Sequence, residues 1–340
     1  MTRTYPLNCW YVAATSDEVT TTPLARRLLD ESTVLFRQSS GTVVALDDRC
    51  AHRGFPLSHG SVVEDEIVCG YHGFTYSSAG VCTRVPSQQA VPARTRVRSY
   101  PIVEDPPFIW IWPGTPQSAN LRRPPTTVLG SDGWAGSGTT FAVAANYTLV
   151  HEHYLDLTHA LVMHREMVPP GIETLPPLGH ITVSEMSVSY RRTLPEAQLA
   201  PWEAQATKLP PGQTCTRTEH GTFVSPALNV GGYEITSAAG DTFRHLRIHA
   251  ITPESDATTR IWLRVARDYA LDDEDVTNGL LGLFATLADR DMKVLELVQA
   301  NQRGSARQVN VVADRAATQA RKVINALVAD EAGRPASRSR

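Results

Sequence analysis

Two short loops, each with one cysteine and one histidine, constrain this chain more than any other feature of its sequence. The first loop is Cys50-Ala-His52, and the second is Cys69-Gly-Tyr-His72. A [2Fe–2S] cluster with two thiolates on one iron and two imidazoles on the other needs this set of ligands. Neutral imidazoles make such a cluster less negative than an all-cysteine cluster, so it accepts an electron more readily. The loops therefore predict a one-electron relay.

Zinc is the alternative metal for these ligands, because it also binds two cysteines and two histidines. Zinc fingers, however, usually pair like ligands, with two cysteines in one loop and two histidines in the next segment. Here each loop supplies one ligand of each kind, which suits a cluster that both loops reach. Gly54, Gly70 and Gly73 favour tight loops whose backbone N–H groups can approach sulfur. The pattern favours the His-ligated cluster, a Rieske centre.

The composition is ordinary for a globular protein, with 42% hydrophobic and 20% charged residues in a chain of 340. A net charge of −3 gives no reason to expect nucleic acid or an anionic membrane as a partner. Outside the two loops, Cys9, Cys82 and Cys215 form no evident disulfide framework, which fits a reducing compartment. No apolar run is long enough to span a membrane, and the N-terminus has no signal-peptide core. We therefore expect a cytoplasmic protein.

The chain is long enough for two domains, and the pattern of its elements predicts an α+β fold. Residues 1–116 are expected to form a small antiparallel β domain with the two loops at one end. Residues 117–332 are expected to form a larger second domain, and the polar residues 333–340 a disordered tail. In the first domain the expected strands cover residues 34–37, 43–46, 67–68 and 108–112. In the second, helices are expected over 146–164, 272–302 and 315–330, a loop over 199–212, and strands over 181–193, 221–231, 242–252 and 260–269.

A second group of ionisable residues lies in the helical segment 146–164, among apolar side chains. Burying such groups requires partners or a metal. Two histidines and one carboxylate on one side of an ion, with open positions opposite, form the triad of Fe(II) oxygenases. On a straight helix His159 and His164 would point about 140° apart, so the helix must end or kink between them to share an ion. The group comprises His151, His153, Asp156, His159 and His164.

The third ligand of such a triad has to come from elsewhere in the chain. Asp291, within the late helix, is our candidate, and Asp289 is the alternative. Ferrous iron activates O₂ with electrons that arrive one at a time, and the cluster can supply them. The two constellations together thus indicate an oxygenase.

With both constellations, the chain resembles the Rieske non-haem iron oxygenases over nearly its whole length. The resemblance rests on the two cluster loops, on the D-x-x-H-x₄-H motif from Asp156 to His164, and on Asp291. It is nearest to the vanillate and dicamba O-demethylase branch. The resemblance implies that His159, His164 and Asp291 bind iron, in a helix-grip domain of the START or Bet v1-like type. It also implies a head-to-tail homotrimer in which Asp156 links the cluster of one protomer to the iron of the next.

Further expectations follow from the resemblance. A separate reductase with flavin and a ferredoxin-type cluster should bring electrons from NADH or NADPH. Asn229 and His249 match substrate-contacting positions of the demethylase branch. His153 stands where this branch commonly has asparagine, and we expect it near the iron or the substrate rather than as a ligand.

The strand expected over 242–252 bears on the substrate. His245, Arg247 and His249 share one of its faces, since side chains alternate along a strand. If that face lines the pocket, Arg247 suits a carboxylate or a sulfonate. Val162, Phe284 and Leu287 are expected to form the apolar part of the pocket.

We therefore predict a monooxygenase that demethylates a methoxy group or hydroxylates a methyl group on an aromatic acid. Within the same chemistry, ring hydroxylation or another oxidation of a polar cyclic metabolite is the alternative. From other classes, the alternatives are a Rieske electron carrier with a ligand-binding domain and a zinc-stabilised binding protein.

Overall fold

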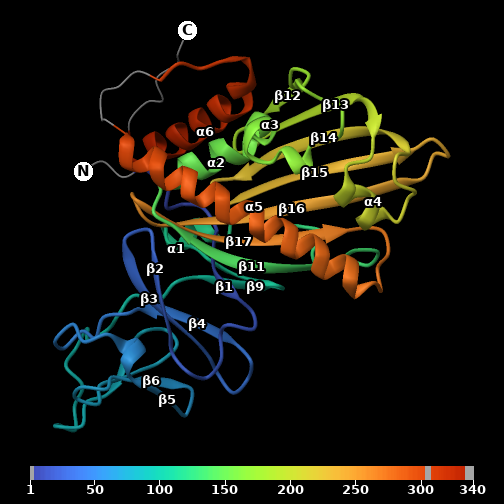
Figure 1. The fold of residues 1–340 in the computed structure, drawn as a ribbon. Helices are drawn as coiled ribbons and strands as arrows, with labels where there is room; N and C mark the ends of the chain where they lie inside the picture. Colours follow the sequence, from blue (N-terminus) through green and yellow to red (C-terminus); the bar gives the residue numbers. More distant parts are fainter. Residues whose placement is uncertain (1–3, 303–307, 334–340) are drawn as a thin grey trace. The chain divides into compact units, whose positions relative to one another are not determined.

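The computed structural model describes residues 4–302 and 308–333, and the chain divides into two compact units (Figure 1). One unit is Leu7–Pro124. The other combines residues 4–6 with residues from 125 onward. All but the first residue of the expected tail 333–340 lies outside the described residues. Among the described residues, no helix combines the length and the apolar character needed to cross a membrane.

The first unit consists of three small antiparallel sheets. Their strand orders are β1-β10-β9, β2-β3-β4 and β5-β6-β7-β8. The four strands expected from the sequence correspond to β3, β4, β6 and β10, and β10 ends one residue earlier than expected, at Ile111. The bounds are β1 Tyr11–Thr15, β2 Leu24–Leu28, β3 Glu31–Arg37, β4 Val43–Asp47, β5 Ser61–Val63, β6 Glu66–Val68, β7 Thr75–Tyr76, β8 Cys82–Arg84, β9 Ile102–Asp105 and β10 Phe108–Ile111, with short helices η1 Leu57–His59 and α1 Pro116–Ala119.

Apolar side chains from two of these sheets form the core beneath the two Cys-His loops. The first loop follows β4, and the second joins β6 to β7. Cys50 and Cys69 belong to this core, together with Phe36, Leu46 and Ile67. The strands therefore fix where both thiols lie.

The second unit is built on a seven-stranded antiparallel sheet in the order β11-β17-β16-β15-β14-β13-β12. Figure 1 shows the long helix α5 crossing one face of this sheet, with α2 and α6 beside it. This is the helix-grip architecture expected from the resemblance, and the α+β class is confirmed. The bounds are β11 Ala135–Val143, β12 Gly179–Val183, β13 Val188–Gln198, β14 Thr214–Ser225, β15 Leu228–Ser237, β16 Thr242–Ser255, β17 Thr258–Arg267, α2 Tyr147–Leu155, η2 Leu157–His159, α3 Ala160–Met163, η3 Arg165–Met167, α4 Pro201–Thr207, α5 Glu274–Asn301, η4 Val312–Asp314 and α6 Arg315–Glu331.

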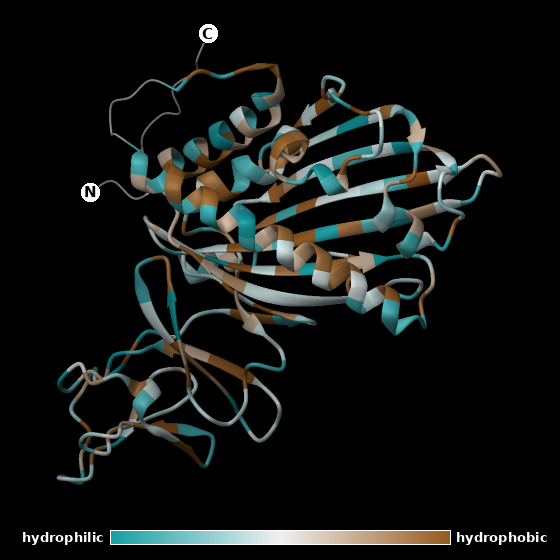
Figure 2. Ribbon diagram, viewed as in Figure 1, coloured by the Kyte–Doolittle hydropathy of each residue, from teal (hydrophilic) through white to brown (hydrophobic). Residues whose placement is uncertain are grey.

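Helix α5 forms where the sequence predicts it, for local reasons. Asp273 caps its N-terminus, with the side chain accepting a hydrogen bond from the N–H of Val276 at 3.0 Å. Buried residues recur at helical spacing along one side, and Figure 2 shows apolar and polar residues alternating around the helix. Asp291 lies on the buried side, four residues after Leu287. The apolar packing of α5 therefore holds a carboxylate inside the unit.

Four expected elements differ from the observed ones. The helix over 146–164 is broken at Asp156, whose backbone is extended. The strand over 181–193 is a hairpin of β12 and β13, turned by hydrogen bonds between Ser184 and Ser187. The strand over 221–231 likewise spans the turn between β14 and β15. Residues 199–212 contain helix α4, which begins at a proline and is anchored by Glu203. Strand β11 was not predicted, because its small polar residues show little alternation.

Two buried ion pairs join the strands and α4 at one end of the sheet. Arg192 Nη2 lies 2.8 Å from Glu219 Oε2, and Arg217 Nη2 lies 2.5 Å from Glu203 Oε2. None of these four side chains is more than 3% exposed. A buried charge left without its partner is strongly destabilising.

We therefore expect Arg192→Met to lower the free energy of unfolding by about 3–5 kcal/mol, since Glu219 would keep a buried, unpaired charge. Urea unfolding followed by tryptophan fluorescence measures this. Arg191→Met is the matched control, because Arg191 is adjacent but 63% exposed, and should change stability by at most about 0.5 kcal/mol. Equal effects of the two substitutions would contradict the prediction.

Candidate metal centres and substrate pocket

The two Cys-His loops repeat one backbone turn. In the first, Cys50 N–H donates to Phe55 O at 2.9 Å, and Gly54 N–H donates to Cys50 O at 2.8 Å. In the second, Cys69 N–H donates to Phe74 O at 2.8 Å, and Gly73 N–H donates to Cys69 O at 3.0 Å. Gly54 and Gly73 have φ values of 70° and 69°, which other residues adopt only with strain. The sequence folds both loops alike.

The side chains of these loops divide between the inside and the surface. Cys50 and Cys69 are 3% and 2% exposed, whereas His52 and His72 are exposed. The two imidazole rings lie 4.6 Å apart between centroids, and His52 stacks on Phe74 at 4.7 Å. Two inner thiols and two outer imidazoles fit a cluster whose His-ligated iron faces outward. Cys82 does not belong to either loop. Its Sγ donates to the carbonyl oxygen of Arg84 in the same strand.

A hydroxyl group that sequence reasoning missed lies beside one thiol. The hydroxyl oxygen of Tyr76 is 3.2 Å from Cys50 Sγ and accepts a hydrogen bond from the N–H of Ala51 at 3.0 Å. Because that oxygen already accepts, its own proton is free to point at sulfur. Cys50 Sγ stands here for a cluster-bound thiolate. The only sequence signal for this contact is that Tyr76 lies close to the second loop, three residues after Gly73.

The second constellation converges because the helix breaks early. Asp156 ends α2 in an extended conformation and caps η2, accepting a hydrogen bond from the N–H of Thr158 at 2.9 Å. Helix α3 then ends at His164, whose φ is −129°. The rings of His159 and His164 consequently lie 5.5 Å apart, nearly perpendicular to one another. The expected end of the helix is present at His164, and an additional break lies at Asp156.

Asp291 meets these imidazoles from α5. Its Oδ1 lies 2.6 Å from His164 Nε2 and 3.2 Å from His153 Nε2. Asp291 is 6% exposed, whereas the competing Asp289 has a 62% exposed side chain and pairs with Lys293 on the helix surface. Asp291 is thus the carboxylate that this arrangement brings to the histidines.

The protonation of these groups suits a metal. Nδ1 of His159 lies 2.7 Å from the carbonyl oxygen of Asp156, which can only accept, so Nδ1 carries the proton and Nε2 is left for a ligand. Burial and the neighbouring His153 lower the pKa of His159 to about 4, so its ring is neutral at pH 7. Burial raises the pKa of Asp291, but the neighbouring imidazoles of His153 and His164 outweigh burial and hold it well below its ordinary value. Neutral imidazoles and an ionised carboxylate are the forms that bind metals.

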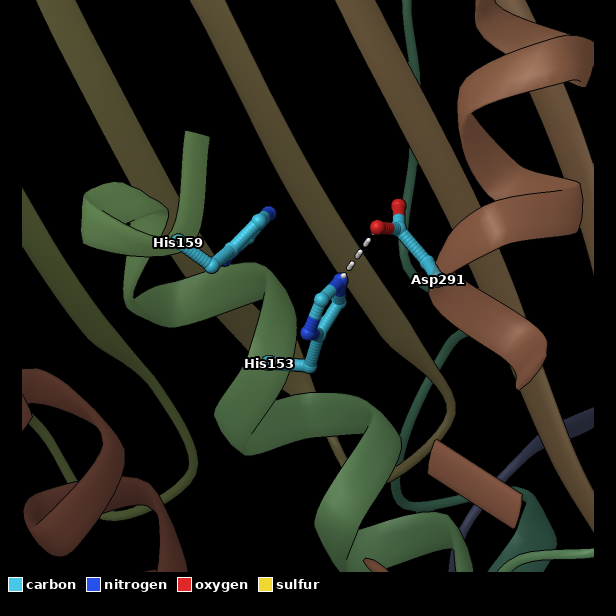
Figure 3. A group of neighbouring side chains, drawn as sticks. All are labelled: His153, His159 and Asp291. Atoms are coloured by element: carbon cyan, nitrogen blue, oxygen red, sulfur yellow. Dashed lines mark ion pairs between the residues drawn. The ribbon is translucent and has the colours of Figure 1, made fainter. Parts of the chain in front are cut away.

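Two imidazole nitrogens in this region are buried without partners. His153 Nε2 and His164 Nδ1 are buried without a hydrogen-bond partner among the described residues. One ligand atom each from His153, His159 and Asp291 lies within 4.8 Å of the others (Figure 3). Buried polar atoms without partners are rare, and a metal ion among His153, His159 and Asp291 would satisfy Nε2 of His153. These residues therefore fit a mononuclear iron site.

A pocket extends from this site between α5 and the sheet. At one end lie His159, His164 and Asp291. Tyr154 and His249 follow, with their rings stacked 3.7 Å apart. Aliphatic and aromatic side chains form most of the remaining wall. They include Leu157, Met167, Leu194, Trp202, Leu263, Phe284 and Leu287.

Arg247 is the exceptional residue of this wall. Its guanidinium carbon lies 5.7 Å from the ring centre of Tyr233 and 5.5 Å from that of Phe284. Its Nε is buried, and among the described residues no acceptor bonds to the guanidinium group. Gly231, paired with Arg247 across β15 and β16, leaves it room. Sequence reasoning identified Arg247 but missed Tyr154, Trp202 and Tyr233, which come from separate elements.

The other predicted substrate residues are placed as follows. His249 lines the pocket. Asn229 lies opposite His249 on the neighbouring strand but does not line the pocket. Its side chain is buried, with 2% exposed, and Nδ2 donates to the carbonyl oxygen of His151 at 3.4 Å. Of the expected apolar wall, Phe284 and Leu287 are present, but Val162 is 84% exposed and the expectation for it is wrong. Val162 lies on the outer side of the short helix α3, which the unpredicted break has reoriented.

His153 lines a second hollow instead of the pocket. Asp156 and His159 lie in this hollow too, facing Val298 of α5 and Arg321 of α6. His159 is therefore part of both hollows.

Comparison with known proteins assigns both units. Residues 9–101 match the Rieske [2Fe-2S] domain, and residues 143–330 match the vanillate O-demethylase oxygenase C-terminal domain. A putative toluene-4-sulfonate monooxygenase system iron-sulfur subunit of Comamonas testosteroni is 30% identical, over 96% of this chain and 98% of its own.

Two comparisons with dicamba enzymes agree. The oxygenase component of dicamba O-demethylase from Stenotrophomonas maltophilia is 30% identical over 87% of this chain and 88% of its own. The crystal structure of dicamba monooxygenase with 3,6-dichlorosalicylic acid superposes with a TM-score of 0.90 at 27% identity, covering 98% of this chain and 99% of that one. The chain therefore belongs to the Rieske non-haem iron oxygenases, with a [2Fe–2S] cluster and a mononuclear iron, and is the terminal oxygenase of a multicomponent monooxygenase system.

Proposed function

We propose that this oxygenase acts on an aromatic acid, removing the methyl group from a methoxy substituent or hydroxylating a methyl substituent. The observation that carries the proposal is the unpaired guanidinium group of Arg247 in a mostly apolar pocket that ends at the mononuclear site. Relatives named for dicamba, vanillate and toluene-4-sulfonate are consistent with such a substrate.

The charges around the pocket support an anionic ligand. Glu203 and Glu219 are already paired with arginines, and each pair is buried. Burial and the charge of Arg247 lower the pKa of His245 to about 3 and that of His249 well below its ordinary value, so both rings are neutral. Arg247 is thus the positive charge of the pocket that has no counterpart. A substrate carboxylate or sulfonate would supply one through charge-assisted hydrogen bonds.

The remaining wall suits the rest of such a molecule. Tyr233 and Phe284 flank the guanidinium group, and Leu263 and Leu287 offer apolar surface to an aromatic ring. An acid group held at Arg247 would direct the opposite end of the ring toward His159 and Asp291. This two-point binding orients a methyl or methoxy carbon.

We assign the cofactor ligands accordingly. Cys50, His52, Cys69 and His72 hold the cluster, and His159, His164 and Asp291 hold the iron. When bound, the cluster supplies single electrons and the iron supplies oxygen activation. A hydroxylated methoxy carbon is a hemiacetal, which separates into a phenol and formaldehyde without further help from the protein. The apolar wall limits the access of water.

Electrons have to reach the mononuclear site from outside the chain. A flavin and iron–sulfur reductase using NADH or NADPH fits this need. We propose a homotrimer in which the cluster of one protomer serves the iron of the next, with Asp156 as the link. Two surfaces support this arrangement. His52, Tyr71 and His72 are exposed on the first unit, and the hollow at Asp156 and His159 is flanked by the exposed apolar residues Leu297, Val298, Val309, Val311 and Val312.

The substrate proposal is tested with a panel of methoxylated and methylated aryl carboxylates and sulfonates. Oxygen uptake with formaldehyde release is expected for a methoxylated member. Arg247→Gln should then raise KM about 30-fold, because truncating a buried charged contact costs about 2 kcal/mol or more. The control Arg244→Gln lies on the same strand but is exposed, and should leave KM unchanged. Absence of oxygen uptake with every member would contradict the proposal.

The contact between Tyr76 and Cys50 should raise the potential of the cluster, because a hydrogen bond to sulfur favours the reduced form. Removing it with Tyr76→Phe is expected to lower the midpoint potential by roughly 40 mV, from a hydrogen bond of about 1 kcal/mol. A dye-monitored titration of the holoenzyme measures this. Tyr100→Phe is the control, because the hydroxyl of Tyr100 bonds to Thr33 and not to a cysteine of the two loops. An unchanged potential in Tyr76→Phe would contradict the prediction.

The trimer proposal predicts complementation between two inactive chains. Cys50→Ser removes the cluster and His159→Ala removes the mononuclear iron, so each variant alone should be inactive. Co-expression should restore part of the activity, because an intact cluster can face an intact iron site across a mixed interface. Co-expression with a chain carrying both substitutions provides the negative control. If neither mixture showed activity, electrons would not cross between protomers, and the trimer proposal would be contradicted.

A further inference from the structure

The imidazole of His153 is aimed into the mononuclear site. Its Nε2 lies 3.2 Å from Asp291 Oδ1, and one nitrogen of its ring falls within 4.8 Å of the ligand atoms of His159 and Asp291. Figure 3 shows the three side chains pointing toward a common space, two from the α2–η2 segment and one from α5. His153 therefore meets the same condition for metal binding as the other two.

Apart from its approach to Asp291, Nε2 of His153 has no polar partner among the described residues. The side chain of His153 is 9% exposed, and Nε2 has no hydrogen-bond partner of acceptable geometry among the described residues. The nearby carboxylate oxygen of Asp291 is close enough, but it already receives Nε2 of His164 at 2.6 Å. A buried nitrogen without a partner destabilises the protein unless something else satisfies it.

The break in the helix explains how His153 reaches this position. On a continuous helix His153 and His159 would point about 120° apart. Because Asp156 is extended, η2 turns back, and the two rings lie 4.1 Å apart between centroids. The segment thus presents two imidazoles to Asp291, and α3 adds His164.

His153 is also separate from the substrate pocket. It is not among the residues that line the pocket but lies in the second hollow, with Asp156. A substrate-contacting role is therefore less consistent with its position than a role toward the metal. Imidazole is a good ligand for iron(II), so His153 would add a third ring to the two histidines and the carboxylate that would hold the metal.

We propose that His153 is an additional iron ligand, so that three imidazoles and one carboxylate surround the mononuclear metal. The site would then keep fewer open positions than a triad of two histidines and one carboxylate. The proposal depends on the presence of the mononuclear site but not on the identity of the substrate.

The test uses the holoenzyme with its cluster intact and cobalt(II) in place of the mononuclear iron. Extended fine structure at the cobalt edge counts imidazole ligands at this site alone, because the cluster contains only iron. Three imidazoles are expected in the wild-type protein and two in His153→Asn. Two imidazoles in the wild-type protein would overturn the proposal without reference to any variant.

A second measurement separates ligation from packing. His153→Phe keeps a ring against His159 but removes the nitrogen, so transfer of cobalt to a chelator should accelerate at least about tenfold. The control His180→Asn changes an exposed histidine at a backbone position, φ 47°, that asparagine tolerates. Unchanged cobalt release in His153→Phe would overturn the proposal. Failure of the aryl-acid panel would leave it intact, since neither measurement involves substrate.

Discussion

The catalytic unit depends on a buried carboxylate that faces several imidazoles. Asp291 is carried inward by the apolar side of α5, which packs on the sheet through Leu280, Phe284 and Leu287. Opposite it, the histidines come from a helix that cannot continue past Asp156. A buried ionised group is costly without partners, and here the packing of α5 and the broken helix together provide them. The fold therefore gathers a carboxylate and imidazoles into the kind of group that binds a metal cation.

Buried charges on the inner face of the sheet are likewise placed next to partners. Arg192 and Arg217 have their own carboxylates, and the hydroxyls of Tyr190 and Tyr233 donate to Glu219 at 3.1 Å. Arg192 and Arg217 are thus balanced by carboxylates, whereas Arg247 faces the pocket without one among the described residues. The pocket consequently distinguishes ligands by charge at one point and by shape elsewhere, as small-molecule sites commonly do.

Local patterns in the sequence predicted much of this arrangement, and tertiary packing determined the rest. The two Cys-His loops and Asp291 could be identified because metal chemistry restricts the residue types at fixed spacing. The break at Asp156 could not, because the apolar residues around it continue a helical pattern while the side chain itself caps the next turn. Pocket residues such as Trp202 and Tyr233 could not be predicted either, since they come together only through the packing of elements distant in sequence. Helix α4 formed where prolines suggested a loop, because Glu203 both caps it and pairs with Arg217.

The two hollows beside the mononuclear site differ in character, in a way that fits the two partners proposed above. His159 lines both of them, with Nδ1 bonded to the carbonyl oxygen of Asp156 and its other nitrogen toward Asp291. One hollow is enclosed by apolar residues and suits an organic substrate. The other contains Asp156 and exposed aliphatic side chains of α5 and the segment before α6, and suits a protein surface. Because the same ring faces both, the proposed electron route on one side and the proposed substrate site on the other would not overlap, and neither partner would need to displace the other.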